Sequence, residues 1–382
     1  MKVLLCGEYS SVHSELASAL TKKGFFVSVL SDGDGYKGFP ADIKVTGAIK
    51  RREVLGNIFY PVFDFFGLAG ISRYLLFDKS MIGSDYDVVQ LINPVVVHEF
   101  GALGNFLLIR YLQKKGKALF LCGLGDDSRW VAACLKKKYK YSPLDRLSFR
   151  NLRNYYGALK YIFNPAYLLL SFYAEQKSHK VLVGLDDYRI AYNGVKKAHF
   201  IRLPISVERF SRPIVKDYSK EPIVVFHAWQ KGKELKKGND ILHDAVLKTL
   251  DVYGDEAIKY VVASGLSYDE FVKSYQGCDI YLDQVYSYDR GVAGALGLAA
   301  GKVVFSGFEL VDQYSDEAPN NIKIIGVNAL PDVDALVAAL SFLIDNPKVV
   351  HDIQSQAYEF ARNNHESSVI ADQYLQVWNG LI

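Results

Sequence analysis

Cysteine is scarce in this sequence, and long hydrophobic runs are absent. The four cysteines, Cys6, Cys122, Cys134 and Cys278, are scattered without a C-x-x-C pair, which excludes a zinc or disulfide framework and predicts buried thiols in a reducing compartment. No apolar run approaches the ~18–20 residues needed to cross a bilayer. Glu8 also interrupts the start too early for a signal peptide. We therefore expect a soluble protein of the cytoplasm.

Common recognition signatures are missing as well. The chain contains no Walker loop and no dinucleotide fingerprint. It also has no helix-turn-helix, RRM or zinc-finger pattern, so we expect no nucleic-acid partner. Internal repeats and low-complexity tracts are absent too, which excludes solenoids and long disordered arms.

The charges are divided unevenly along the chain. The net charge is +3, yet the first 205 residues hold 29 of the 45 Lys and Arg residues and only 17 of the 42 Asp and Glu residues. This asymmetry indicates two units with different partners. Basic clusters at Lys50–Arg52, Lys114–Lys117 and Lys136–Lys140 suit an anionic membrane surface or a phosphorylated acceptor.

Apolar strands alternate with amphipathic helices in both halves. A strand over Met1–Gly7, a helix over Ser14–Lys23 and a strand over Phe25–Leu30 form a β-α-β unit, which requires a parallel sheet. The alternation of strands and helices is interrupted in the polar, proline-bearing stretch Pro204–Pro222 and resumes with a strand at Ile223–Ala228.

This pattern predicts an α/β fold of two tandem Rossmann-like domains facing across a cleft. We expect an N-terminal acceptor-side domain over residues 1–205 and a C-terminal nucleotide-sugar-binding domain over 206–365. The last helix, 366–382, can cross back to the N-terminal domain. A cleft between two such domains is a favoured ligand site.

The segment Pro222–Val246 is the most informative single stretch. An apolar strand passes into a loop rich in lysine and glycine, and an amphipathic helix follows at once. Such a loop brings backbone N–H groups, a helix dipole and lysine ammoniums to the carboxyl end of a strand, where a diphosphate can bind. The alternative is an ordinary strand-to-helix turn with solvated lysines.

Two segments of the basic half are unusually aromatic, Phe59–Leu76 and Tyr155–Tyr173. One interpretation is a helix pair that enters an anionic membrane interface or lines a groove for a lipid-linked acceptor. The other is ordinary core packing, because aromatic side chains are usually buried.

Several ordered motifs carry a family resemblance. They are Lys237-Gly238 after a strand, Gly-Leu-Ala-Ala-Gly-Lys-Val-Val at 297–304, Leu-Pro-Ile-Ser-Val-Glu-Arg-Phe at 203–210, and Cys-Asp-Ile-Tyr-Leu-Asp-Gln at 278–284. With these the chain resembles the GT-B glycosyltransferases, and most closely the large retaining, nucleotide-sugar-using branch and its bacterial members from capsule and O-antigen synthesis. The resemblance implies metal-independent, retaining transfer of a sugar from a nucleotide sugar to a polysaccharide or lipid-linked glycan, with no cofactor. It also implies a place in the cytoplasm, peripheral to the inner face of the membrane.

The resemblance assigns a donor side to the second domain. Lys237, with Lys231 or Lys233, corresponds to the basic pair that holds the donor diphosphate and neutralises charge on the leaving nucleotide. Backbone amides near the start of the following helix are expected on the same phosphates. The full donor set is Lys231, Lys233, Lys237, Gly238, His227, Asp283, Gln284, Tyr288, Gly291 and Val292.

One departure from the family pattern concerns two glutamates. The family commonly carries them with seven residues between, and the second binds ribose; here the two positions hold Tyr288 and Leu296. This departure leaves open a different donor grip, or a catalytically impaired relative that acts as a partner or scaffold. A sugar-nucleotide epimerase, which shares the two-domain plan, is a third hypothesis.

The catalytic candidates are Asp126, Asp127 and His13 in the first domain. Relatives place a histidine or acidic residue where Asp126 and Asp127 stand, and a carboxylate there can orient an acceptor hydroxyl or take its proton. The alternative is an N-cap for the helix that starts at Ser128. His13 can contact the sugar or the acceptor, or be structural, and His98 is a weaker candidate.

Overall fold

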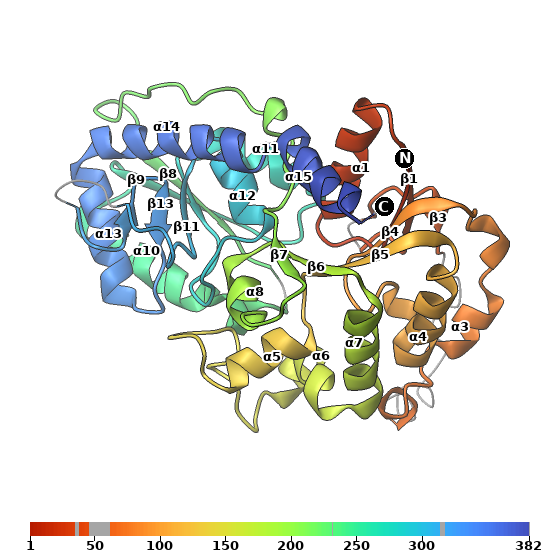
Figure 1. The fold of residues 1–382 in the computed structure, drawn as a ribbon. Helices are drawn as coiled ribbons and strands as arrows, with labels where there is room; N and C mark the ends of the chain where they lie inside the picture. Colours follow the sequence, from red (N-terminus) through yellow and green to blue (C-terminus); the bar gives the residue numbers. More distant parts are fainter. Residues whose placement is uncertain (35–37, 46–61, 231, 314–317, 382) are drawn as a thin grey trace.

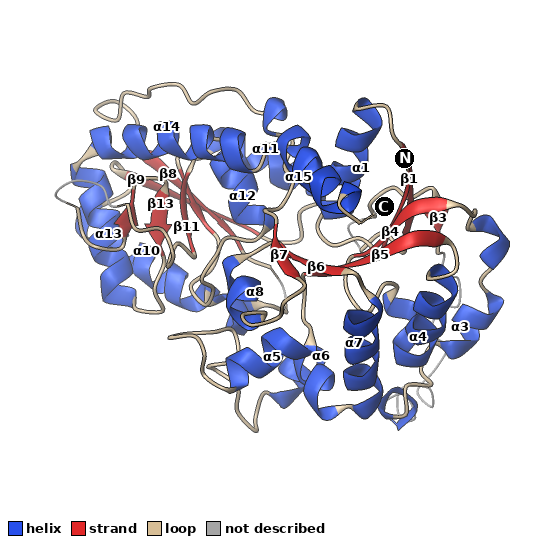
Figure 2. Ribbon diagram, viewed as in Figure 1, coloured by secondary structure: helices blue, strands red, loops and turns tan. Residues whose placement is uncertain are grey.

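The computed structural model describes residues 1–34, 38–45, 62–230, 232–313 and 318–381. It contains two sheets, each flanked by helices, with their strands running mainly parallel (Figures 1 and 2). The predicted α/β class with two Rossmann-like units is therefore confirmed. The chain boundaries at 205 and 365 stay predictions, and the connection between the sheets runs from Phe200 to Ile223.

The N-terminal sheet is seven-stranded, in the order β3-β2-β1-β4-β5-β6-β7, and every described pairing in it is parallel. Its strands are β1 (Lys2–Cys6), β2 (Phe26–Ser31), β3 (Ile43–Lys44), β4 (Tyr86–Leu91), β5 (Gly116–Gly123), β6 (Lys180–Val183) and β7 (Ala198–Phe200). Its helices are α1 (Val12–Lys22), α3 (Ile71–Leu76), α4 (Gly101–Leu112), α5 (Ser128–Leu135), α6 (Leu152–Phe163), α7 (Pro165–Lys177) and α8 (Asp186–Ala191).

The C-terminal sheet is six-stranded, in the order β12-β13-β11-β10-β8-β9, and its only antiparallel pair among the described strands is β12 with β13. Its strands are β8 (Ile223–Ala228), β9 (Ile258–Ala263), β10 (Ile280–Leu282), β11 (Val303–Ser306), β12 (Ile322–Lys323) and β13 (Gly326–Asn328). Its helices are α9 (Glu234–Lys237), α10 (Asn239–Tyr253), α11 (Tyr268–Ser274), α12 (Val292–Ala299), α13 (Val333–Asp345) and α14 (Pro347–Asn364), and α15 (Ser367–Asn379) follows.

Alternate residues of each strand supply the two faces of each sheet, as a fully covered parallel sheet requires. In the C-terminal sheet, Val225 and Ile280 pack with α10 and α13, whereas Phe226 and Tyr281 pack with α12. The carboxyl ends of these strands and the start of α12 thus meet at one edge.

The last helix, α15, does cross back to the N-terminal domain (Figure 1). Ile370, Tyr374 and the fully buried Trp378 share a core with α1 and with one face of the N-terminal sheet. The Trp378 ring lies 6.2 Å from that of Phe120 on β5. The C-terminal residues therefore complete the core of the first domain.

A buried carboxylate joins the domains at the segment that leads to α12. Asp187 of α8 accepts hydrogen bonds from the backbone N–H groups of Tyr288 (3.2 Å) and Asp289 (3.0 Å) and from the hydroxyl of Ser287 (3.1 Å). Asp289 in turn accepts a bond from the N–H of Asp186 at 2.9 Å. This reciprocal contact fixes the loop 287–289 against the N-terminal domain.

We expect the protein to be less stable at pH 8 than at pH 5. Burial raises the pKa of Asp187 from its ordinary 3.8 to about 7, and burial also raises the pKa of Glu8 to about 7 and that of Asp127 to about 6. Between the unfolded and folded pKa values, only the folded state keeps these protons, so stability falls as pH rises through this window. Denaturant titrations from pH 4.5 to 8 measure the slope.

The variant Asp187→Asn should flatten that slope, because it removes one of the titrating groups. Asp251→Asn, which changes an exposed carboxylate on α10, serves as the control and should leave the slope unchanged. A slope in Asp187→Asn equal to that of the parent protein would contradict the assignment.

Candidate functional site

A cavity of about 510 Å³ opens between the domains, at the carboxyl ends of β8, β9 and β10. The C-terminal domain supplies most of its wall, and Ser10 and Phe39 extend it from the N-terminal domain. Its C-terminal lining residues are Ala228, Trp229, Gln230, Lys233, Lys237, Ala263, Gly265, Leu266, Ser267, Phe271, Tyr281, Asp283, Gln284, Gly291, Val292, Ala293 and Leu296.

The lysine loop after β8 closes against the segment after β10. Gly238 has φ +71°, and a Cβ there would lie 2.4 Å from Cγ2 of Val285, so both the backbone conformation and the space require glycine. The Val285 N–H donates to the carbonyl of Lys237 at 2.9 Å. These contacts hold the Lys237 side chain at the wall of the cavity.

Lys237 forms a buried ion pair with Asp283. Its Nζ lies 2.7 Å from Asp283 Oδ1, and the hydroxyl of Ser306 donates to Oδ2 at 2.8 Å. The Asp283 side chain is only 2 % exposed. An ammonium has three donors, so Lys237 can hold Asp283 and still donate to an anion in the cavity.

The start of α12 faces the same cavity. Gly291 is its N-cap residue, and because glycine has no side chain, no cap hydrogen bond covers the first N–H groups of the helix. A Cβ on Gly291 would meet no described atom within 4 Å, so the space in front of these N–H groups is open. Gly291, Val292 and Ala293 all line the cavity. The first N–H groups of a helix are good anion donors and carry its positive dipole end, so this edge attracts phosphate.

Two further predicted donor residues lie at the cavity, and one cannot be placed. Lys233, immediately before α9, and Gln284, immediately after Asp283, are both in the lining. The Gln284 amide donates to the carbonyl of Asp289 at 3.3 Å. Lys231 lies outside the described residues.

His227 and Tyr288 are not among the cavity-lining residues. His227 is fully buried, with Nδ1 2.7 Å from the Tyr260 hydroxyl and Nε2 3.0 Å from the Asn239 amide. Burial lowers its pKa to about 3, which keeps the ring neutral. The Tyr288 hydroxyl accepts the N–H of Lys140 at 2.6 Å.

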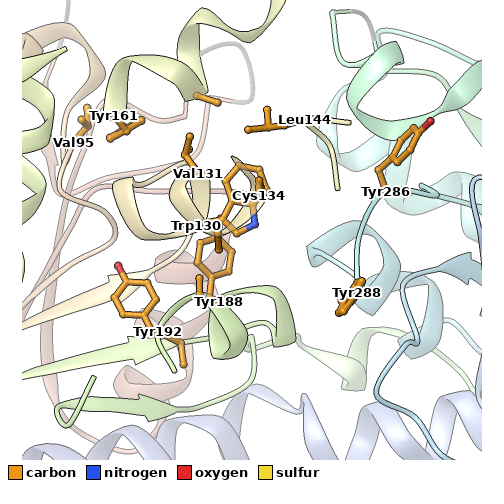
Figure 3. Packing of buried hydrophobic residues seen from close by; sticks show 14 of the residues in the cluster. Val95, Trp130, Val131, Cys134, Leu144, Tyr161, Tyr188, Tyr192, Tyr286 and Tyr288 are labelled. Carbon is orange, nitrogen blue, oxygen red and sulfur yellow. The ribbon is translucent and has the colours of Figure 1, made fainter. Parts of the chain in front are cut away.

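Tyr288 belongs instead to an aromatic contact between the domains. Its ring lies 5.3 Å from the rings of both Tyr139 and Tyr141. Figure 3 shows it with Tyr286 on the C-terminal side of a cluster that also contains Trp130 and Tyr188 of the N-terminal domain. Tyr288, which stands where the family that this chain resembles commonly has a glutamate, therefore packs one domain against the other.

The two aspartates predicted as catalytic candidates have different surroundings. Asp127 is 1 % exposed and caps α5, accepting the N–H of Trp130 and the hydroxyl of Tyr192, both at 2.8 Å. Asp126 is partly exposed and is not among the cavity-lining residues, and its Oδ2 lies 3.8 Å from Nζ of Lys236 on α9. Of the two aspartates, Asp126 is thus the one that faces the lysine loop after β8.

His13 lies in the interior of the N-terminal domain and is not among the cavity-lining residues. Its Nδ1 donates to the carbonyl of Gly7 at 2.8 Å, and its Nε2 lies 3.1 Å from the Gln90 amide. Burial lowers its pKa to about 4. His98 is exposed, and its ring stacks on Tyr9 at 5.4 Å.

The apolar and aromatic part of the cavity wall was not predicted from the sequence. Trp229, Phe271 and Tyr281 line the cavity, and none was a predicted site residue. Trp229 follows β8 directly, so its place at a strand end was a usable signal. Tyr281 lies inside an apolar strand, where the pattern predicts core.

The described ranges contain neither a metal-binding cluster nor a membrane-spanning helix. Within them, no group of three or more His, Cys, Asp or Glu side chains is arranged to hold a metal ion. Every helix in the same ranges is too short or too polar to cross a membrane.

Solved structures with the same architecture cover the whole chain. Sucrose-phosphate synthase from Thermosynechococcus elongatus superposes with a TM-score of 0.57 at 11 % identity, covering 100 % of this chain and 99 % of that one. Anabaena HepE in complex with UDP and glucose gives 0.55 at 13 % identity, covering 99 % of both chains. A glycosyltransferase from Rickettsia africae gives 0.53 at 14 % identity, covering 99 % of this chain and 97 % of the other.

Comparisons of sequence add no match, because neither a protein-family model nor a curated protein matches the chain. The structural likeness nevertheless extends over both domains and over the returning C-terminal helix. It confirms the predicted architecture, and the chain has the GT-B fold of glycosyltransferases.

Proposed function

We propose that this protein is a glycosyltransferase that uses a nucleotide-sugar donor bound in the cavity between its domains. The observation that carries the proposal is the convergence of the Lys237 ammonium and the open start of α12 on one cavity. When a glycosidic bond to a nucleoside diphosphate breaks, negative charge grows on the leaving phosphate. A cation and a helix N-terminus placed there stabilise that charge more in the transition state than in the ground state.

The same two groups support metal-independent transfer, because they supply the positive charge that a divalent ion supplies elsewhere. Solved structures of HepE hold UDP, UDP-glucose, or UDP and glucose, which supports a nucleoside diphosphate as the ligand class. Transfer with retention is part of the proposal and rests on the family resemblance alone.

For the acceptor, the proposal places Asp126 at the reacting hydroxyl. It is partly exposed, it lies across the cleft from the donor loop, and a carboxylate can orient a hydroxyl or take its proton. A glycan or lipid-linked glycan of bacterial surface polysaccharides is the proposed acceptor class, with the protein in the cytoplasm.

Titration calorimetry with UDP-, GDP- and dTDP-sugars tests the donor proposal. We expect at least one to bind with a dissociation constant below about 1 mM, with the free nucleoside diphosphate binding comparably. If no member of the panel binds at millimolar concentration, the scaffold hypothesis replaces the enzyme. Leu296 favours that second candidate, because it puts an apolar side chain on the cavity wall where the resembling family has a ribose-binding carboxylate.

An exposed apolar face on the N-terminal domain supports a peripheral membrane location. Residues 62–68 pack between α4 and α7, and Asp64 anchors them by accepting the hydroxyls of Tyr156 (2.6 Å) and Tyr167 (2.7 Å). Around this anchor, large apolar side chains point to solvent. The apolar face consists of Val62, Phe63, Phe65, Phe66, Leu68, Leu75, Leu76, Phe163, Leu168, Leu169 and Phe172.

The aromatic segments contribute side chains both to the core and to the surface. Tyr155, Tyr161 and Tyr167 are core residues, whereas Leu169 and Phe172 are 66 % and 62 % exposed. Exposed Arg153 and Lys177 lie on α6 and α7, the helices that carry Phe163, Leu169 and Phe172, so we propose an anionic lipid surface as the occupant. Residues 59–61 and the cluster Lys50–Arg52 lie outside the described residues.

The double variant Leu169→Ser/Phe172→Ser should bind anionic vesicles at least about tenfold more weakly, since each buried side chain contributes about 1.5–3 kcal/mol. Flotation with phosphatidylcholine vesicles containing phosphatidylglycerol measures this. Val252→Ser, which changes a side chain 73 % exposed on α10, is the matched control. Equal binding by the double variant, or no binding by the parent protein at low salt, would exclude the apolar face as a membrane site.

A further inference from the structure

One polar group in the cavity wall lacks a well-formed hydrogen bond. Tyr281, the middle residue of β10, lines the cavity with its side chain fully buried, and its hydroxyl makes no hydrogen bond of normal geometry to any described residue, although the Tyr275 hydroxyl and the Asp283 carboxylate lie nearby. Buried hydroxyls are normally satisfied, and one that is not carries a desolvation cost. A phenylalanine would avoid that cost, so the hydroxyl at this position calls for a partner from outside the chain.

The ring of Tyr281 is held in place on several sides. Phe226 stacks on it at 5.9 Å, and the rings of Tyr275 and Phe271 meet it edge-on at 5.0 and 6.0 Å. Above it, a Cβ on Gly297 of α12 would lie 3.2 Å from Cδ1 of Tyr281. The ring is therefore fixed between these side chains and α12, and the buried hydroxyl cannot rotate out to water.

The neighbouring Tyr275 provides the contrast. Its ring touches that of Tyr281, yet its hydroxyl donates to the carbonyl of Ala293 at 2.6 Å. Of these two adjacent buried hydroxyls, that of Tyr275 makes a well-formed hydrogen bond within the fold, whereas that of Tyr281 makes none of normal geometry.

The polar groups along the cavity wall indicate which part of a bound nucleotide would lie where. Lys237 and the N-terminus of α12 mark the diphosphate position, and Leu296, one turn further along α12, offers no hydrogen bond. Tyr281 packs in the same core cluster as Leu296. In a bound nucleotide the ribose lies next to the diphosphate. The Tyr281 hydroxyl is the buried polar group beside that position.

We propose that the Tyr281 hydroxyl hydrogen-bonds a ribose hydroxyl of the donor nucleotide and replaces a carboxylate as the ribose-recognition group, a role that rests on the proposed function. Burial and then the nearby charge of Asp283 raise the pKa of Tyr281 well above 10, so the group stays protonated and can donate. In the absence of ligand this hydroxyl costs stability, and in its presence the cost is recovered as affinity.

The variant Tyr281→Phe tests the role with two independent measurements. Titration calorimetry compares UDP and GDP with their 2′-deoxy and 3′-deoxy forms. We expect the parent protein to prefer one ribose form by about tenfold, the effect of one hydrogen bond, and Tyr281→Phe to lose that preference. Without ligand, the melting temperature of Tyr281→Phe should equal or exceed that of the parent, because no well-formed internal bond is removed.

Tyr275→Phe is the matched control. It removes an internal hydrogen bond, so it should lower the melting temperature while keeping the preference for the ribose form. A preference retained in Tyr281→Phe, or a lower melting temperature in that variant without ligand, would overturn the proposal while leaving the donor site intact. If the parent protein binds no nucleoside diphosphate, the proposed function and this role fail together.

Discussion

Replacing Lys237 with alanine is expected to lower the free energy of unfolding by about 3–5 kcal/mol and to weaken nucleotide-sugar binding by roughly a hundredfold. The stability loss follows from Asp283, whose side chain is 2 % exposed and would lose its cationic partner. The Ser306 hydroxyl at 2.8 Å would be its remaining side-chain donor. The affinity loss follows from the missing ammonium at the phosphate position.

The double variant Lys237→Ala/Asp283→Asn separates these two effects. It also replaces the carboxylate left without a partner, so it should recover most of the stability while leaving the affinity low. Urea denaturation and titration calorimetry provide the two readouts, and Lys259→Ala, an exposed lysine on β9, controls for the loss of one positive charge. A double variant that binds nucleotide sugar as tightly as the parent would refute the phosphate role of Lys237.

Gly307→Ala is expected to destabilise the protein by about 1–3 kcal/mol and to disrupt nucleotide binding as well. A Cβ on Gly307 would lie 2.4 Å from the carbonyl oxygen of Ser287 and 2.5 Å from the backbone N of Asp289. These are backbone atoms of the loop that Asp187 holds, so the whole loop must move. The start of α12 follows this loop directly and would move with it.

Gly277→Ala is the control for that substitution, because a Cβ on Gly277 would meet nothing described within 4 Å. We expect Gly277→Ala to bind nucleotide as the parent does and to differ little in stability. Differential scanning calorimetry and nucleotide titration measure both variants. Unchanged nucleotide affinity in Gly307→Ala would show that α12 is positioned independently of the loop.

The overall architecture could be predicted because the periodic signals are local. Apolar runs of strand length, amphipathic helices between them and a polar crossing after Pro204 describe two parallel-sheet units. The donor loop was predictable for the same reason, because Lys237, Gly238 and Gly291 stand at strand ends and helix starts, where the fold itself directs them to one edge.

Burial decided the roles that the sequence left open. His13, His227 and Asp127 are all polar residues near strand ends, yet tertiary packing surrounds each with backbone or side-chain partners. Tyr288 contacts residues about 150 positions away, and no local pattern reports such a contact. Tyr281 could not be predicted for a different reason. A tyrosine inside an apolar strand is typical of a core position, and only the lack of a well-formed hydrogen bond to its hydroxyl distinguishes it.

The position of α15 sets the order in which the two domains can complete their folding. It covers one face of the N-terminal sheet, and its Asp372 pairs with Lys23 across 349 residues of sequence. During synthesis the first domain emerges early, but that face stays open until residues 367–379 have been made. Contacts across so long a loop form slowly, so the N-terminal half keeps apolar surface exposed until the C-terminal half has folded and α15 has packed against it.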